Sequence, residues 1–468
     1  MGVLAWLSAS FMRKLFDRLH LRMGDFWWYS IMLFCAYRTA DALNAFVGLW
    51  LVPKYISPEE LGAVVPLSNF ANCLALPLAA FANAFRNEVS RLSVERNMGQ
   101  LKTLLRSVFV ATGIFLVLAL VVVRFALPLF LERIRIVEGS LGILILISSF
   151  LGAISPFYTF ALQSLKKFKE QSIMSVVGAP IRLLTMLMAM PFRALSGYFV
   201  GQSAPTAFGI IASLFCLRKE LSVKAEPYWS REVVRRFART FMLFAIGGLA
   251  SNFYVLIEST ILRQRLPDID SAGYYMVSRF SEIANFLYLA IVFAMFPFSA
   301  ELAAKGRDYM KLVFKAGFVV ALCNVFLAIP FLFFGRDILG MLPNGADYAQ
   351  FWWAIPWQIA LHSSGAFIGL YLTAEMSANR FGYLKWTMPF DLIYPVILLL
   401  VTGHGYFAGY IPESWTAFLA EHNIYSLSAM LIWMTVANVL KLVVCVVFVL
   451  RSPCRRIEKN APIDRREL

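Results

Sequence analysis

The chain has 468 residues, of which 60% are hydrophobic and only 15% are charged. Soluble globular proteins carry charge on about 25% of their residues, so this composition excludes an ordinary soluble domain. It indicates an all-helical integral membrane protein that crosses the bilayer many times. The net charge of +15 comes from basic residues whose position in the loops is described below.

The first segment, residues 1–24, is predicted to be an amphipathic cytoplasmic helix on the membrane surface. Phe11, Leu15 and Leu19 recur every four residues among arginines and a lysine, which is typical of such helices. The alternative is a disordered basic tail. A cleavable signal peptide is not expected, because the positive charges follow the first apolar run instead of preceding it.

Twelve apolar segments have the length of a membrane-spanning helix, since roughly 20 residues cross the hydrocarbon core. The fifth and sixth are the least separated, with little more than Pro191, Phe192 and Arg193 between them. The predicted spans are 27–52, 62–85, 107–130, 140–163, 172–191, 195–217, 240–262, 274–298, 312–334, 349–373, 386–403 and 427–450.

The orientation follows from the lysines and arginines of the loops. With the N-terminus inside, 30 of them lie on the cytoplasmic side and 7 on the opposite side. Such an asymmetry predicts that both termini are cytoplasmic. The basic excess would then face the anionic lipid of the inner leaflet, and no nucleic-acid partner is expected.

Sequence motifs repeat at a distance of about 210 residues. Met32-Leu33-Phe34 matches Met242-Leu243-Phe244, and Gly62 matches Gly273. The repeat predicts two six-span lobes in parallel orientation, with a substrate site between them near the midplane. The expected organisation is an N-terminal segment (1–24), an N-lobe (25–217), a basic cytoplasmic linker (218–239), a C-lobe (240–450) and a basic cytoplasmic tail (451–468).

Two predicted spans carry an arginine followed three residues later by an acid. The pairs are Arg38 with Asp41 and Arg279 with Glu282, and residues three apart share one helix face. A charge at membrane depth costs at least about 2.5–3.5 kcal/mol. Two interpretations stay open: self-neutralising pairs that permit insertion, or a polar lumen in which the arginines bind an anionic substrate.

Two acidic residues are candidates for coupling transport to an ion, H⁺ or Na⁺. Glu258 lies in the seventh span; alternatively, it is an interfacial carboxylate partnered by Arg263 or Arg265. Asp391 lies in the eleventh span; alternatively, it is a partner for Lys385. Such intramembrane acids often mark ion pathways.

The other intramembrane cations have plainer interpretations. Arg86 ends the second span and is a candidate for the substrate entrance, or a residue that extends to the interface. Arg124, Arg182 and Lys441 are interpreted as snorkelling or packing residues. The six cysteines and four histidines show no disulfide or metal-ligand spacing, and no GxxxxGK[ST] motif occurs. No resident metal or cofactor is therefore expected.

The chain resembles the Wzx-like polysaccharide transporters of the MOP superfamily, which include O-antigen flippases. The resemblance is carried by the twelve spans in two lobes, by WLVPKYISPEELGAVVPLSNF after the first span and by a G-Y-x-x-A-x-R run. Gly273, Tyr274 and Arg279 match that run, while Val277 replaces its small residue. Multidrug antiporters of the same superfamily share the architecture.

The resemblance implies a MATE-like V-shaped bundle whose central cavity is lined by the first, second, seventh and eighth spans. It implies a bacterial inner-membrane flippase that moves an undecaprenyl-pyrophosphate-linked oligosaccharide to the outer leaflet beside other polysaccharide-assembly proteins. In this family, cationic lumen residues hold the pyrophosphate, and Arg38 and Arg279 are the positions that fit.

Two rival functions remain open. A cation-coupled multidrug exporter of the same fold would need a carboxylate-dominated lumen. A membrane polysaccharide polymerase or ligase would need catalytic residues in a large outside loop. The longest such loop, 403–423, has no lysine or arginine and only two acids, Glu413 and Glu421, so the interpretation here is a transporter and not an enzyme.

Overall fold

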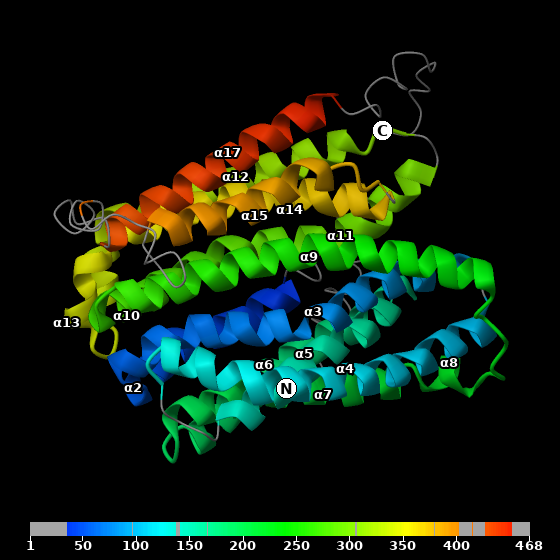
Figure 1. Ribbon diagram of the computed structural model, residues 1–468, viewed down its shortest axis with the longest axis horizontal. Helices are drawn as coiled ribbons and strands as arrows, with labels where there is room; N and C mark the ends of the chain where they lie inside the picture. Colours follow the sequence, from blue (N-terminus) through cyan, green and yellow to red (C-terminus); the bar gives the residue numbers. More distant parts are fainter. Residues whose placement is uncertain are drawn as a thin grey trace, which may run out of the picture.

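The computed structural model describes residues 35–95, 97–136, 141–165, 167–304, 307–378, 380–401, 414 and 426–451. The predicted N-terminal amphipathic helix, almost all of the loop at 403–423 and the tail after Arg451 lie outside these residues. The described chain is built of helices that run side by side (Figure 1).

The first half of the chain forms the N-lobe. Its first span is helical from Cys35 to Phe46, continues as a π-helical turn and ends at Tyr55. Four residues, Met190–Arg193, separate the fifth and sixth spans. The elements are η1 (Val47–Leu51), α2 (Val52–Tyr55), α3 (Pro58–Val94), α4 (Met98–Arg133), α5 (Leu141–Ser164), α6 (Phe168–Ala189) and α7 (Ala194–Cys216), with the short α8 (Arg218–Ser222) in the linker.

The second half forms the C-lobe, whose helices α12, α14, α15 and α17 lie above α9 in Figure 1, while the N-lobe helices lie below it. Its eighth span is divided into α10 and α11 by a 3₁₀ turn, η2. The elements are α9 (Arg231–Arg265), α10 (Asp268–Ser281), η2 (Glu282–Ala284), α11 (Asn285–Ala304), α12 (Met310–Gly340), α13 (Gly345–Tyr348), η3 (Ala349–Phe351), α14 (Ala354–Ser377), α15 (Leu384–Val401) and α17 (Leu427–Arg451).

The internal repeat seen in the sequence is present in the helix boundaries. Equivalent helices of the two lobes end and begin 210 positions apart, so the repeat reflects one architecture used twice. The matching boundaries are Tyr55 with Arg265, Pro58 with Asp268, and Val94 with Ala304.

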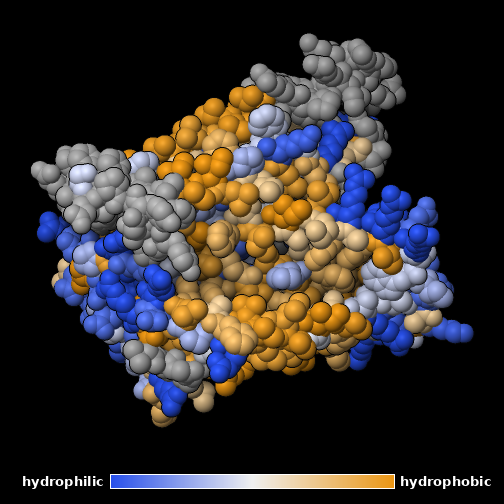
Figure 2. Space-filling model, viewed as in Figure 1, coloured by the Kyte–Doolittle hydropathy of each residue, from blue (hydrophilic) through white to orange (hydrophobic). Residues whose placement is uncertain are grey.

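The surface has the distribution expected of a bilayer protein. Eight of the described helices are long and apolar enough to span a membrane. Large hydrophobic side chains such as Phe109, Phe125 and Phe333 are exposed, and Figure 2 shows an apolar band between two hydrophilic ends. Exposed apolar area on this scale marks a surface that contacts lipid.

The lobes meet along α3 and α9, and the buried core differs at the two ends of this seam. At the end where α9 meets α10, one cluster joins both lobes, for example through Leu61, Ile261 and Ala272. At the α3–α4 end, Phe85 of α3 and Phe244 of α9 belong to one cluster, whereas Val313 of α12 belongs to another. The lobes therefore share buried side chains at both ends of the seam, but at the α3–α4 end the helices α11, α12 and α14 form a core of their own.

Candidate functional site

The charged pair of the first span is formed as the spacing predicts. Arg38 Nη2 lies 2.8 Å from Asp41 Oδ2, and both side chains are largely but not fully buried. Less than two turns later, the helix widens into the π-helical turn η1. Such turns are rare and occur often at functional sites.

The charged pair of the eighth span lies at a second helix irregularity. Arg279 Nη2 lies 2.8 Å from Glu282 Oε1, and the guanidinium lies 5.2 Å from the centre of the Tyr275 ring. Glu282 begins the 3₁₀ turn η2, which separates α10 from α11. Each pair is therefore next to a short segment that departs from the regular α-helix.

The two irregular spans touch each other. The Tyr275 hydroxyl donates a hydrogen bond to the Gly48 carbonyl at 3.4 Å. A Cβ added at Gly48 would lie 3.4 Å from Arg279 Cδ. The arginine of the opposite lobe therefore lies close to the η1 backbone, with room left for one methyl group.

Three adjoining cavities lie beside the two charged pairs. The largest, about 480 Å³, is lined by Arg279, Glu282 and Glu258 among others. A second, about 460 Å³, is lined by Arg38, Asp41 and Arg182. A smaller cavity of about 160 Å³, called the central cavity below, lies between them. It shares Asp41 and Arg182 with the second cavity, and Arg279 and Glu282 with the first. Arg38 and Arg279 thus line different cavities, and the third cavity adjoins both of them.

Arg182 is the site residue that sequence reasoning missed. It was interpreted as a snorkelling or packing residue, but it lies in the central cavity and interacts electrostatically with Arg279 and Glu282. Among the residues that the structure describes, no hydrogen bond or ion pair joins its guanidinium to another side chain. Its Nε is buried without a partner. The available signal was the polar face formed at helical spacing by Gln171, Ser175, Gly178 and Arg182.

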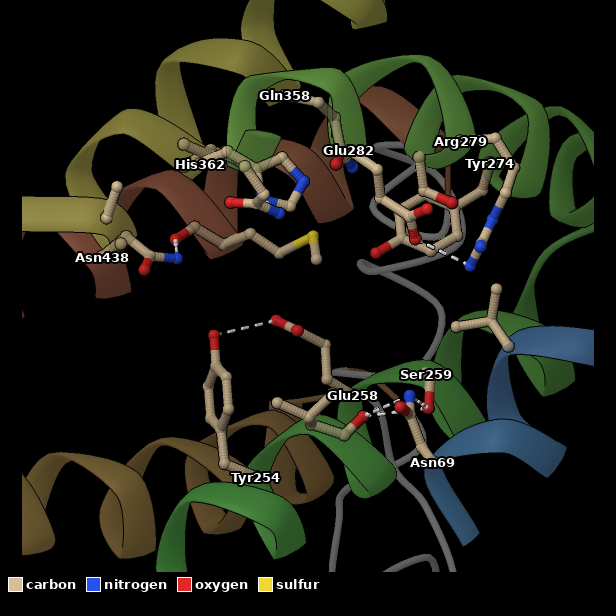
Figure 3. A pocket seen from close by; sticks show the side chains of 18 of the residues that line it. Asn69, Tyr254, Glu258, Ser259, Tyr274, Arg279, Glu282, Gln358, His362 and Asn438 are labelled. Atoms are coloured by element: carbon tan, nitrogen blue, oxygen red, sulfur yellow. Dashed lines mark hydrogen bonds and ion pairs between the residues drawn. The ribbon is translucent and has the colours of Figure 1, made fainter. Parts of the chain in front are cut away.

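Glu258 faces the largest cavity from α9, opposite Arg279 and His362 (Figure 3). Its Oε1 accepts hydrogen bonds from the hydroxyls of Tyr394, at 2.9 Å, and Tyr254, at 3.4 Å. The alternative pairing with Arg263 or Arg265 is wrong for Arg263, which is bound to Asp268 instead. No ion pair joins Glu258 to a cation in the described part of the chain.

Asp391 is buried, and its partner is not the predicted Lys385. Its Oδ1 forms an ion pair with Lys441 of α17, and its Oδ2 accepts a hydrogen bond from Ser251 of α9 at 2.9 Å. Lys441, interpreted from the sequence as a snorkelling residue, therefore neutralises a buried acid. This arrangement ties α9, α15 and α17 together.

Arg86 does not extend to the interface. Its guanidinium lies 4.8 Å from the ring centre of Phe160 in α5 and 3.6 Å from that of Phe296 in α11. Cation–π contacts of this kind are favourable when the groups are desolvated. Arg86 therefore joins α3 to the C-lobe at the α3–α4 end of the seam.

Two residues further along α3, Glu88 forms an ion-pair network across the same end. It accepts hydrogen bonds from Arg236 at 2.8 and 3.1 Å, from Tyr228 at 2.6 Å and from Arg91 at 3.1 Å. Burial alone would raise the pKa of Glu88, but these hydrogen bonds and the positive charges of Arg236 and Arg91 outweigh burial and lower it. Burial and the bond to Glu88 raise the pKa of Tyr228 to about 12.

No group of three or more metal-ligating side chains occurs within the described ranges. The site consists of adjoining polar cavities in the apolar interior, with arginines at their centre and a tyrosine-bound carboxylate beside them.

The fold is similar to that of solved membrane transporters. A MOP superfamily transporter from Pyrococcus furiosus, whose binding pocket is described as of reverse polarity, matches at a TM-score of 0.65 with 10% identity over 94% of this chain and 98% of its own. A MATE protein in the straight conformation matches at 0.63 with 14% identity over 94% and 99%. An outward-facing multidrug resistance MATE family transporter of the MOP superfamily matches at 0.60 with 11% identity over 94% and 99%.

No protein-family model and no curated protein matches the chain. The likeness to the solved structures covers nearly the whole length of each chain. At these identities it establishes a MATE-like fold, and the chemistry of the site has to be argued from the residues themselves.

Proposed function

We propose that the protein is a flippase that moves an undecaprenyl-pyrophosphate-linked oligosaccharide from the inner to the outer leaflet by alternating access. The observation that carries this proposal is the Arg182 guanidinium in the central cavity, beside two arginines that already have acidic partners. Arg38 and Arg279 are each neutralised by a carboxylate at 2.8 Å. Arg182 has no such carboxylate partner in the described part of the chain and adds a further positive charge beside Arg279.

A phosphate group is the ligand that such an arrangement favours. Guanidinium groups bind phosphate through two parallel hydrogen bonds, and these bonds are strong where water is scarce. Arg182 and Arg279 line the same small cavity. A bound pyrophosphate would relieve the repulsion between these two cations, and this repulsion has no other evident benefit.

The core clusters are compatible with an alternating-access cycle. At the α9–α10 end one cluster joins both lobes, whereas at the α3–α4 end α3 shares a cluster with α9 but α11, α12 and α14 form a separate core. If both termini are cytoplasmic, the α3–α4 end faces the inner leaflet. Opening there, which breaks the contacts of Arg86 and Glu88, would load the charged cavities from the inner leaflet, as the proposed direction of transport requires.

A cation-coupled multidrug exporter is the second candidate, and Glu258 favours it. A buried carboxylate held by two tyrosines, with no cation paired to it in the described structure, suits a proton, a sodium ion or a cationic drug. One solved protein of similar fold is described as a multidrug resistance MATE family transporter. Another is described as having a binding pocket of reverse polarity that suggests a different function, so pockets of either charge are compatible with the fold.

The test is transport by the purified full-length protein in liposomes. The substrate is undecaprenyl-pyrophosphate-linked N-acetylglucosamine, and a membrane-impermeant lectin measures its appearance on the opposite leaflet. Arg182→Ala and Arg279→Ala should each lower the rate by at least about tenfold, because losing a charge-assisted hydrogen bond costs about 1.5–3 kcal/mol. Arg124→Ala is the matched control, since Arg124 is exposed on the apolar surface of α4.

An unchanged rate in both cavity variants would remove the basis of the flippase proposal. Ethidium efflux measured in the same liposomes separates the second candidate. Efflux that depends on Glu258 and is insensitive to Arg182 would establish the drug exporter in its place.

A further inference from the structure

The cavity of the N-lobe differs in chemistry from the other two. It measures about 460 Å³ and is lined chiefly by uncharged polar side chains, including Thr159 of α5, Gln171 and Ser175 of α6, and Gln202 and Thr206 of α7. Small-molecule sites commonly measure about 300–1,000 Å³. Hydroxyl and amide groups gathered at membrane depth have no obvious structural purpose, because polar groups in the apolar interior are costly.

Gln171 is the side chain that points to a ligand. It is only 5% exposed, and its Nε2 donates a hydrogen bond to the Tyr37 hydroxyl at 2.9 Å. Its Oε1 is buried without a partner, as is the Oδ1 of Asn44, which lines the same cavity. A buried acceptor left unsatisfied costs about 1–3 kcal/mol. A ligand that donates hydrogen bonds to both amide oxygens would remove this cost.

The missing donor identifies the class of ligand. Fully ionised phosphate oxygens only accept hydrogen bonds and leave an amide oxygen unsatisfied. The hydroxyl groups of a sugar donate and accept, and they match a wall of amides and hydroxyls. Among the described lining residues only Arg38, Asp41 and Arg182 are charged, and two of them, Asp41 and Arg182, also line the central cavity.

We propose that the N-lobe cavity is a saccharide subsite that binds the sugar attached directly to the phosphate. The inference rests on the proposed function, because the phosphate is taken to lie at Arg182 and Arg279. A sugar bound against Gln171 and Gln202 would place its anomeric phosphate toward Arg182, which lines both cavities. The protein would then select its substrate by the first sugar as well as by the charge of the head group.

The experiment measures binding of small probes to the purified full-length protein by calorimetry. The probes are inorganic phosphate, glucose 1-phosphate and N-acetylglucosamine 1-phosphate. At least one sugar phosphate should bind about tenfold or more tightly than inorganic phosphate, since two or more added hydrogen bonds of about 1 kcal/mol each amount to that factor.

Two variants test the location of the sugar. Gln171→Leu and Gln202→Leu should each reduce the affinity for the preferred sugar phosphate by about fivefold or more, because each removes one hydrogen-bonding amide of about 1 kcal/mol. Affinity for inorganic phosphate should stay unchanged, which also shows that the variants are folded. Thr185→Val is the matched control on α6, since the Thr185 hydroxyl donates to its own helix at Ile181 O.

The outcomes separate the subsite from the flippase proposal. If sugar phosphates bind no more tightly than inorganic phosphate, or if both glutamine variants weaken all three probes equally, the saccharide subsite is wrong and the phosphate site stands. If none of the probes depends on Arg182, the phosphate site is wrong, and the subsite falls with it.

Discussion

Arg279 of the eighth span packs against Gly48 of the first, across the boundary between the two lobes. The contact has room for one carbon: a Cβ at Gly48 would lie 3.4 Å from Arg279 Cδ and 3.9 Å from the Tyr275 hydroxyl. These are ordinary van der Waals separations. The space next to the arginine is therefore limited but not closed.

Side-chain size at position 48 should control transport. We expect Gly48→Ala to keep at least half of the wild-type rate and Gly48→Leu to lose about tenfold, since overpacking costs about 1–3 kcal/mol and displaces Arg279. The lectin assay in liposomes measures both. Equal activity of the two variants would show that the position of Arg279 does not matter for transport.

Glu258 should report on ion coupling. Glu258→Gln keeps the shape and the hydrogen-bonding capacity but cannot change charge, so we expect transport to lose its response to an imposed pH or Na⁺ gradient. Tyr394→Phe removes one hydrogen bond, worth about 1 kcal/mol, and should weaken that response without abolishing it.

The measurement is the initial rate in liposomes with each gradient imposed separately. Glu132→Gln, at the exposed end of α4, is the control and should keep the full response. If Glu258→Gln responds to the gradients as the wild type does, the coupling site lies elsewhere.

Asp391 and Lys441 should behave as a structural pair. Asp391→Ala leaves the lysine uncompensated near buried surface, and we expect a loss of about 3–5 kcal/mol in the free energy of unfolding. The double variant Asp391→Leu/Lys441→Leu should recover most of this loss, because an apolar pair can replace a buried ion pair. Thermal unfolding in detergent compares the variants; a double variant no more stable than the single one would contradict the pairing.

Glu88 should make the α3–α4 end sensitive to acid. The native state lowers the pKa of this carboxyl below its ordinary 4.5, so its stabilising contribution is complete above that value and disappears as pH falls through the lower, native pKa. We expect Glu88→Gln to reduce stability at neutral pH and to flatten the loss of stability below about pH 4.5. Unfolding temperatures between pH 3 and pH 7 test this. If the unfolding temperatures of variant and wild type fall in parallel with pH, protonation of Glu88 does not control stability at acid pH.

The sequence predicted the helices because lipid imposes a simple rule on them: a span needs enough apolar residues in a row. The pairs Arg38 with Asp41 and Arg279 with Glu282 were also predictable, since residues three apart meet on one face whatever the rest of the fold does. In both pairs the nearest charged atoms lie 2.8 Å apart. Local geometry alone determines these features.

Partners distant in sequence could not be found in the same way. Lys441 reaches Asp391 across 50 positions, and Arg86 packs between rings of both lobes. A membrane helix that is apolar around most of its circumference does not show which side faces its neighbours. For Arg182, the polar helix face that also carries Gln171 indicates a position in the protein interior. An arginine considered without that face suggests only a side chain at the membrane interface.

The wide turn at Val47–Leu51 should make the first span tolerant of a one-residue deletion. A hydrogen bond that closes over five residues instead of four accommodates about one surplus residue per turn. Deleting one residue there should let the helix relax to regular winding while the faces on either side keep their alignment. The same deletion a turn earlier would rotate every later residue by about 100° and turn the bare backbone away from the opposite lobe.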